Sequence, residues 1–429
     1  MPALLCVVLA ACADDGAGPR FANEPPSTED AVLTATTEDA VLTATTPRET
    51  PPTTTPNLPA ASPVPLAQLL TAPGGVSKIV LQVGDDLIAM SPPWSQPRPI
   101  WSGSNDRLVA FGASPTGDAV ALLIAGSDGE DRIDLVLISP DGAQMRRVEN
   151  LERITGGAAT SRAPDGASSL SWSPDGTQVL ASLATGGILT IPRSGDPQLL
   201  IGPSRAAAPG DVAWSPRGDA IAYIDPAVPT AAGGLYVAQI GAVPLDPVPV
   251  IPPAADRRRT VSRVAWTLDG EALLYTVAST AGDPTFGGDL FRISAAGGTP
   301  RLVAGASRVG PVSAITNFAP SPDGTGVAYV VTMPDESGNP TDSLWLQPIG
   351  SNETERLPLG AGERVTGLWW TVDGLLWSAA HTGNGDAELI LYRAKAGESP
   401  GVVYRGPAAP ATPEASQDAS PVAASPAAD

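Results

Sequence analysis

Carboxylate side chains are concentrated in long, irregular segments of this 429-residue chain. Such oxygen-rich segments could bind a hard cation such as Ca²⁺, but none has the regular D-x-D-x-D-G spacing and final glutamate of an EF-hand loop. The candidate ligand-binding acids are Asp283, Asp289, Asp335, Asp342 and Asp386, with Glu336 and Glu388 beside them. We expect solvated acidic loops without a metal ion, and we predict no cofactor.

One basic cluster could bind an anion instead. The sequence DRRRT, from Asp256 to Thr260, holds Arg257, Arg258 and Arg259 in succession. A guanidinium group can bind a carboxylate or phosphate through two parallel hydrogen bonds. An ordinary solvated loop is the alternative interpretation.

A serine stands in a possible nucleophile loop in SLSWSPDGTQVLAS, from Ser169 to Ser182. Both flanks alternate apolar and polar residues, while Ser173, Pro174, Asp175 and Gly176 all favour turns. Related segments begin at Phe111, Val212, Val264, Phe318 and Leu368, and their turn positions lie 42 to 59 residues apart. A motif that recurs at this period indicates a repeated structural unit, so we predict a hairpin turn rather than a catalytic serine.

Other catalytic arrangements find little support. His381 is the single histidine, which excludes a two-histidine metal site. A Ser/His/Asp triad would have to use His381 as its base. The chain has no G-x-S-x-G elbow after a strand and no Walker motif. We therefore expect a protein that is not an enzyme, and the alternative is a hydrolase or lyase with an acidic site at the mouth of a central channel.

The elements that must position these residues are short strands. Each repeat continues after its turn with a second apolar strand, a loop of variable length, a third strand and a short fourth strand, which is typical of one propeller blade. One repeat position holds a tryptophan four times, at Trp172, Trp214, Trp266 and Trp370, and we interpret these side chains as blade packing. The segment from Ser77 to Trp101 supplies three more strands without the turn motif.

We therefore predict an all-β fold, a single propeller over residues 76–406. Seven four-stranded antiparallel blades are favoured, because closure of the ring removes exposed sheet edges. Six blades with an irregular N-terminal hairpin are the alternative. The strand missing from the first blade would come from Leu66 to Leu70 or from the chain after Tyr404.

The apolar-Trp pair, the S/T-x-D-G turn and an exit such as AAGGTPRLV resemble the WD-like propeller repeat of TolB and of the propeller domains of prolyl-oligopeptidase-type enzymes. The resemblance covers roughly Val76 to Gly406 and implies the fold. It says little about activity, since propellers have many unrelated functions.

The N-terminus indicates export. Residues 1–11 form a short apolar run, and the sequence Leu9, Ala10, Ala11, Cys12 resembles the bacterial lipobox, in which cleavage leaves a lipid-modified cysteine. Residues 12–75 are rich in Pro and Thr and are predicted to be a disordered tether, and residues 407–429 a disordered Ala/Pro/Ser-rich tail. We expect a lipid anchor on the extracytoplasmic side of the cell membrane, with secretion as the alternative.

Charge limits the partners. The chain has 25 Lys plus Arg against 45 Asp plus Glu, a net charge of −20, which disfavours nucleic acid and anionic lipid headgroups. We expect a monomer that binds a protein, peptide or glycan of the cell envelope. The long loops between second and third strands share one face of a propeller, and that face is where we expect the ligand.

Overall fold

The computed structural model describes residues 79–83, 86–94, 97–103, 106–126, 132–156, 169–183, 186–203, 210–225, 234–241, 245–252, 259–279, 288–309, 313–337, 339–371, 374–381, 388–395 and 398–407. The chain divides into two units, Met1–Ser62 and Pro63–Asp429, and every described residue lies in the second. Predictions for the signal peptide, most of the tether and the C-terminal tail concern residues outside this description.

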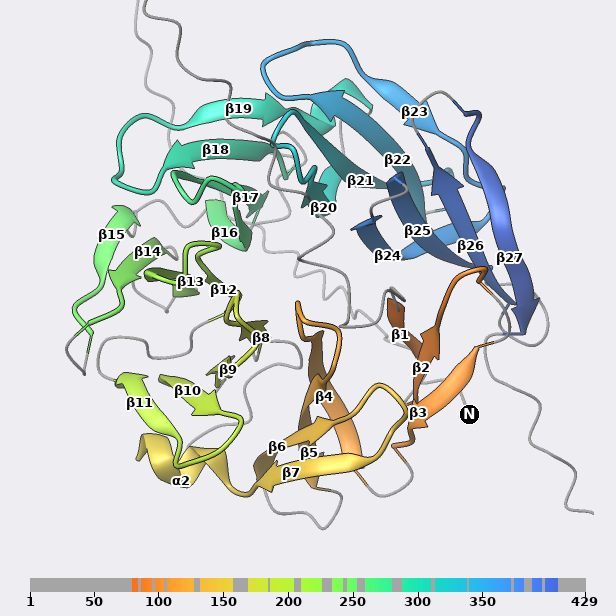
Figure 1. Ribbon diagram of the computed structural model, residues 1–429. Helices are drawn as coiled ribbons and strands as arrows, with labels where there is room; N and C mark the ends of the chain where they lie inside the picture. The colour runs from red at the N-terminus through yellow and green to blue at the C-terminus, as the bar shows by residue number, and fades with distance from the viewer. Residues whose placement is uncertain are drawn as a thin grey trace, which may run out of the picture. The chain divides into compact units, whose positions relative to one another are not determined.

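The described strands form seven antiparallel sheets around a common axis, which confirms a seven-bladed propeller (Figure 1). Blade 1 has three strands, β1 (Ile79–Val83), β2 (Asp86–Met90) and β3 (Arg98–Trp101). Blade 2 contains β4 (Asp106–Ala113), β5 (Val120–Gly126), β6 (Ile133–Ile138) and β7 (Gln144–Val148). Blade 3 contains β8 (Ser169–Trp172), β9 (Gln178–Ser182), β10 (Ile188–Pro192) and β11 (Gln198–Ile201).

The other four blades also have four strands each. Blade 4 contains β12 (Val212–Trp214), β13 (Ala220–Asp225), β14 (Gly234–Gln239) and β15 (Val248–Ile251), and blade 5 contains β16 (Arg259–Trp266), β17 (Ala272–Ser279), β18 (Leu290–Ser294) and β19 (Arg301–Ala304). Blade 6 contains β20 (Ala314–Pro320), β21 (Gly326–Pro334), β22 (Pro340–Pro348) and β23 (Glu355–Leu357). Blade 7 contains β24 (Glu363–Thr371), β25 (Gly374–His381), β26 (Glu388–Ala394) and β27 (Gly401–Pro407).

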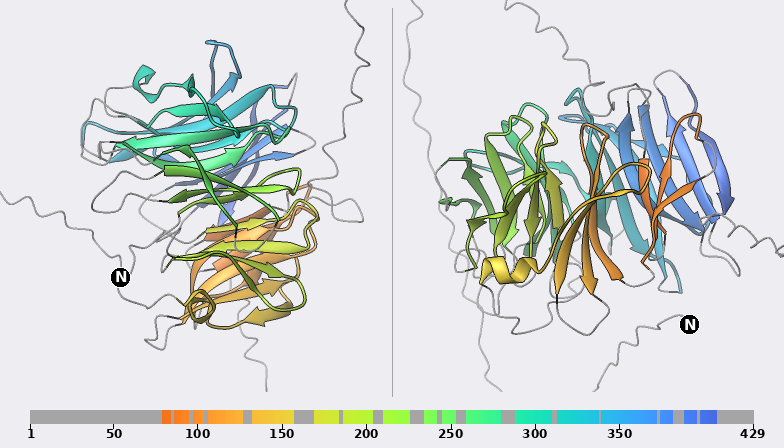
Figure 2. Two further views of the ribbon diagram at one scale, coloured as in Figure 1. Left: turned by 90° about the vertical axis from the view of Figure 1, so that its left-hand side faces the viewer. Right: turned by 60° about the horizontal axis from the view of Figure 1, so that its bottom comes forward.

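Two short helices join blades. The helix α2 (Leu151–Thr155) follows blade 2 and packs beside β6 and β11, and the 3₁₀ helix η1 (Ala306–Arg308) follows blade 5 (Figure 2). Within the described part of the chain, neither helix has the length and apolarity that a membrane span requires.

Several strands in the middle of a blade are apolar over most of their length because both of their faces are covered. In β5 and β13 the first five residues are all buried, with no alternation. A strand packed on both faces has this continuous apolar pattern, whereas the outer strands β15 and β19 expose half or more of their residues. The blade-to-blade contacts, which we call seams, therefore contain the core.

The predicted turns are confirmed, and they join the first and second strands. In blade 3 the backbone N–H of Gly176 donates to the carbonyl of Ser173 at 2.9 Å, and Gly176 has φ 67°, a left-handed conformation that glycine adopts without strain. The hydroxyl of Ser173 donates to Asp175 Oδ1 at 2.6 Å and accepts from the backbone N–H of Gln178 at 3.0 Å. The Ser173 side chain is thus part of the turn.

Each seam has its own apolar cluster. Leu137 of blade 2 and Leu189 of blade 3 belong to one cluster, for example, and both are buried. The ring closes in the same way, because Ile79 and Leu81 of blade 1 belong to one cluster with Leu389 and Leu391 of blade 7. Among the described residues, no strand is shared between these two blades.

The strand missing from blade 1 is the innermost one. The bulge between β2 and β3 has the same form as the bulge between the third and fourth strands of blades 4 and 5, so β1 to β3 correspond to strands two to four. Tyr404 lies in β27, which pairs with β26 inside blade 7. The chain from Tyr404 to Pro407 therefore does not supply the missing strand. The rest of the chain after Tyr404 and the other expected source, Leu66 to Leu70, lie outside the described residues.

Candidate functional site

Asp289, one of the predicted ligand-binding acids, has a structural contact. Its Oδ1 accepts the backbone N–H of Ala306 at 2.9 Å. Asp134 of blade 2 accepts the backbone N–H of Asn150 at 2.8 Å in the same way. In both blades an aspartate near the start of the third strand accepts a backbone N–H from the chain that follows the fourth strand.

Asp342 and Asp335 also hold the fold together. The Oδ2 atom of Asp342 accepts the backbone N–H of Val365 at 2.9 Å and lies 3.0 Å from Nε of Arg364, so it joins blade 6 to blade 7. The Oδ1 atom of Asp335 accepts the backbone N–H groups of Ser337 and Asn339, both at 2.8 Å, and stabilises an exposed hairpin.

The remaining predicted site residues are not brought together by the structure. Arg259 begins β16, where its backbone pairs with Ser279, and its side chain lies outside the described residues. Cys12, Arg257, Arg258, Asp283 and Asp386 lie wholly outside them. No three His, Cys, Asp or Glu side chains in the described ranges are placed to hold a metal ion. A ligand on the loop side stays a prediction.

The described hollows lie instead on the opposite side of the ring, which we call the turn side because the turns between first and second strands lie there. A central hollow of about 440 Å³ is formed by the ends of the innermost strands β12, β16, β20 and β24 and by the turns that follow β12, β16 and β20. Its lining is apolar and includes Trp214, Pro216, Trp266, Leu268, Pro322, Trp369 and Trp370. No titratable side chain is among the described residues that line it, and Leu268 is 39% exposed.

Three of the four repeated tryptophans join their blade to the blade before it. The indole Nε1 of Trp172 donates to the carbonyl of Gly112 at 2.8 Å, across the seam between blades 2 and 3. Trp266 donates to Ala213 and Trp370 to Ala319, both at 3.1 Å. Their interpretation as packing residues is supported by this contact, which we call the indole latch.

Trp214 lacks the indole latch. Its Nε1 is buried and has no hydrogen-bond partner among the described residues. The residue that corresponds to Gly112 is Ser171, and its hydroxyl accepts the backbone N–H of Trp214 at 2.9 Å. A buried donor without a partner is rare and destabilising, so the indole of Trp214 is held less firmly than its equivalents.

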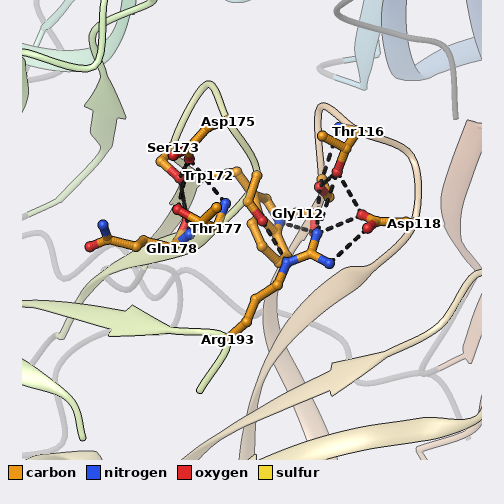
Figure 3. A network of polar contacts seen from close by, with 11 residues as sticks. Gly112, Thr116, Asp118, Trp172, Ser173, Asp175, Thr177, Gln178 and Arg193 are labelled. Carbon is orange, nitrogen blue, oxygen red and sulfur yellow. Dashed lines mark hydrogen bonds and ion pairs between the residues drawn. The ribbon is translucent and has the colours of Figure 1, made fainter. Parts of the chain in front are cut away.

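The seam between blades 2 and 3 is filled on the turn side by Arg193, which follows β10 (Figure 3). Its guanidinium group lies over the indole ring of Trp172, 5.2 Å from the ring centre, and binds both carboxylate oxygens of Asp118 at 2.7 and 2.5 Å. Its Nε donates to the carbonyl of Gly176 at 2.5 Å. The hydrogen bonds from Arg193 hold the pKa of Asp118 well below its usual range.

The next seam, between blades 3 and 4, is hollow at the corresponding place. This seam pocket has a volume of about 440 Å³ and is lined by Ser173, Asp175, Gln178, Trp214 and Ile240, among others. The hydrogen bond from the Ser173 hydroxyl lowers the pKa of Asp175, so this carboxylate is charged at neutral pH. Trp214 lines both the seam pocket and the central hollow. We therefore take the connected surface around Trp214 as the candidate site.

Similarity to known proteins supports a lipoprotein-type β-propeller. Residues 288–411 match the family model described as the lipoprotein LpqB beta-propeller domain, and this range runs from the third strand of blade 5 through blade 7. The finer resemblance to TolB stays a prediction. No curated protein matches the chain.

Among solved structures, one from a structural and mechanistic analysis of two prolyl endopeptidases is similar, with 10% sequence identity and a TM-score of 0.53. The match covers 81% of this chain and 52% of that chain, so it spans about half of the endopeptidase. At this identity the similarity concerns the fold alone.

Proposed function

We propose that this protein is a membrane-anchored extracytoplasmic lipoprotein, lipidated at Cys12, whose propeller binds an extended segment of a partner protein on the turn side. The match of residues 288–411 to a lipoprotein propeller family supports the first part. The lipobox-like sequence before Cys12 supports the anchor. A binding role without catalysis is part of the same proposal.

The central hollow carries the second part. Ligand pockets are usually concave and mostly apolar, with aromatic side chains in the lining, and the hollow has this chemistry. Trp214, Trp369 and Trp370 offer flat apolar surfaces on rigid innermost strands. General acid or base catalysis needs titratable groups, and the described lining contains none.

The same lining favours a peptide over a glycan. Sugar hydroxyl groups that leave water need hydrogen-bond partners, and the hollow offers few polar side chains to supply them. One of these, the Ser321 hydroxyl, already donates to Asp323 Oδ1 at 2.5 Å within its own turn. An apolar or aromatic side chain of a partner protein suits the hollow better.

The test is selection of peptides from a random displayed library on the full-length protein, followed by affinity measurement on two leucine variants. Leu268→Asp places a charge in the central hollow, while Leu302→Asp makes the same change at a 54% exposed leucine of the outer strand β19. We expect selected peptides with apolar anchors, whose binding is lost in Leu268→Asp and kept in Leu302→Asp. Equal affinity for both variants would overturn the proposal.

A further inference from the structure

The seam pocket corresponds to the space that Arg193 fills one seam earlier. Backbone hydrogen bonds define this equivalence, because the N–H of Arg193 donates to the carbonyl of Thr177 at 3.0 Å and the N–H of Ile240 donates to the carbonyl of Asp219 at 2.7 Å. Thr177 and Asp219 are the fourth residues after Ser173 and Ser215, which begin equivalent turns. Ile240 therefore stands where a second seam filled in this way would require an arginine.

The groups that surround the guanidinium of Arg193 have counterparts in the seam pocket. Around Arg193 these groups are the indole of Trp172, the carbonyl of Gly176 and the hydroxyls of Ser114 and Thr116, in addition to Asp118. At the equivalent positions of the next seam stand Trp214, Gly218, Ser173 and Asp175, all of which line the pocket. The seam pocket thus has an aromatic surface, a hydroxyl group and a carboxylate, but it has no arginine at the position that corresponds to Arg193.

The carboxylate has moved by two residues along the turn. Thr177 occupies the position of Asp118, and Asp175 occupies the position of Thr116, whose hydroxyl lies 3.4 Å from Arg193 Nη2. The hydroxyl of Ser173 and the backbone N–H and hydroxyl of Thr177 all donate to Oδ1 of Asp175. Oδ2 of Asp175 can therefore accept a further donor.

Two neighbours leave this place accessible. Ile240 is 40% exposed and brings an apolar side chain that cannot pair with Asp175. Arg217, which also lines the pocket, binds Glu271 of blade 5 at 3.1 Å. Its Cδ lies 3.1 Å from the place that a Cβ on Gly270 would take, so its side chain extends toward blade 5.

We propose that the seam pocket binds the guanidinium group of an arginine in the partner segment, stacked on Trp214 and paired with Asp175. A planar guanidinium group combines stacking on an aromatic ring with several N–H donors in one plane, which a lysine ammonium group does not. The net charge of −20 favours the approach of a basic segment. This inference rests on the proposed peptide binding and specifies one side chain of the peptide.

The test uses N-acetyl-L-arginine amide as the probe, with the matching lysine and citrulline amides for comparison. Binding to the full-length protein is followed by NMR or calorimetry. Citrulline keeps the planar shape of arginine and lacks its charge. We expect arginine amide to bind about tenfold or more tightly than either of the others, as one charge-assisted contact in a partly buried site requires.

Two variants and two matched controls locate the binding. Asp175→Asn removes the charge and keeps an oxygen for the turn, and its control Asp323→Asn makes the same change in the equivalent turn of blade 6, where Ser321 and Thr325 donate to Asp323. Ile240→Arg places an arginine in the pocket from the protein's own chain. Its control is Ile349→Arg, at the equivalent position of blade 6, where Pro320 replaces the tryptophan.

We expect probe binding to weaken about tenfold in Asp175→Asn and to be lost in Ile240→Arg, with no change in either control. Ile240→Arg should also raise the thermal midpoint, because it adds the contacts that Arg193 makes one seam earlier. Equal binding of arginine and citrulline amides, or unchanged binding in Asp175→Asn, would overturn the inference. Leu268→Asp separates the two proposals, since it should abolish binding of the selected peptide and leave binding of the arginine amide intact.

Discussion

The guanidinium group of Arg193 binds both carboxylate oxygens of Asp118 across the seam between blades 2 and 3, at 2.7 and 2.5 Å. The two residues are 75 positions apart in the sequence, and the pair adds an ionic contact to the apolar cluster of this seam. A second arginine, Arg146 of blade 2, donates to the backbone carbonyls of Pro192 and Gly195 across the same seam. This seam therefore has two arginines across it, whereas hydrogen bonds at the next seam involve serine hydroxyls, such as those of Ser171 and Ser182.

The pair predicts a dependence of stability on pH. The pKa of Asp118 is lower in the folded protein than in the unfolded chain, so its contribution is present above the ordinary value of 3.8 and is lost as the pH falls below it. Since the Asp118 side chain is 44% exposed, screening limits the effect, and Asp118→Asn should lower the free energy of unfolding by about 1 kcal/mol at pH 7. Urea denaturation at pH 7 and pH 3 measures the difference. The same loss at both pH values would contradict the assignment, and Glu271→Gln, in an exposed ion pair, is the control.

The indole latches predict unequal effects of the same substitution. Trp370→Phe removes the N–H that donates to Ala319 and keeps an aromatic ring, so it should lower the free energy of unfolding by about 1 kcal/mol more than Trp214→Phe. Trp214 has no such bond to lose among the described residues, and its replacement also removes a buried donor without a partner. Guanidinium denaturation of both variants measures the difference. Equal losses would show that the latch contributes nothing.

Closure of the ring by side chains predicts where the propeller opens. Leu391→Ala and Leu189→Ala each remove a fully buried leucine from the third strand of a blade, and each should lower the free energy of unfolding by about 2–5 kcal/mol. Only Leu391→Ala weakens the seam between blades 7 and 1. Amide hydrogen exchange should therefore increase in β1 and β2 in that variant alone. If Leu189→Ala increased exchange in β1 equally, closure would not depend on local packing.

The lipid anchor predicts a modified Cys12. Labelled palmitate should be incorporated into the wild-type protein in its native host and be absent from Cys12→Ala, with the protein then released from the membrane fraction. Because Cys6 is the other cysteine, Cys6→Ala is the matched control and should keep the label. Label that persists in Cys12→Ala would exclude lipidation at this position.

Much of the fold could be predicted from the sequence because each turn is determined locally. The serine, aspartate and glycine of SPDG make their contacts within a few residues, as Ser173 and Gln178 do, so a repeated motif identifies each hairpin. Closure of the ring favours seven blades, because it removes exposed sheet edges, but the sequence alone leaves six blades as an alternative. Trp94 and Trp101, which lie outside the tryptophan repeat, pack in the seams on either side of blade 1.

The candidate site could not be predicted in the same way, because it depends on differences between equivalent positions in neighbouring blades. Trp214 and Trp172 occupy the same repeat position and look interchangeable in the sequence. Trp214 differs in the neighbour at the latch position, Ser171, whose hydroxyl accepts its backbone N–H, whereas the carbonyls of glycine or alanine accept the N–H of the other three indoles. The acids Asp289 and Asp342 looked available for a ligand, although backbone N–H groups in later segments of the chain already bind them.

The order of the blades also has a mechanical consequence. The covalent chain crosses six of the seven seams, and in the described residues the seam between blades 7 and 1 is held by side chains alone. Force applied through the N-terminal end of the propeller would act on β1 and shear this seam before any other. A pull through that end would thus unroll the propeller blade by blade from blade 1, and the seam pocket between blades 3 and 4 would open only after both seams of blade 1 and the seam between blades 2 and 3 had parted.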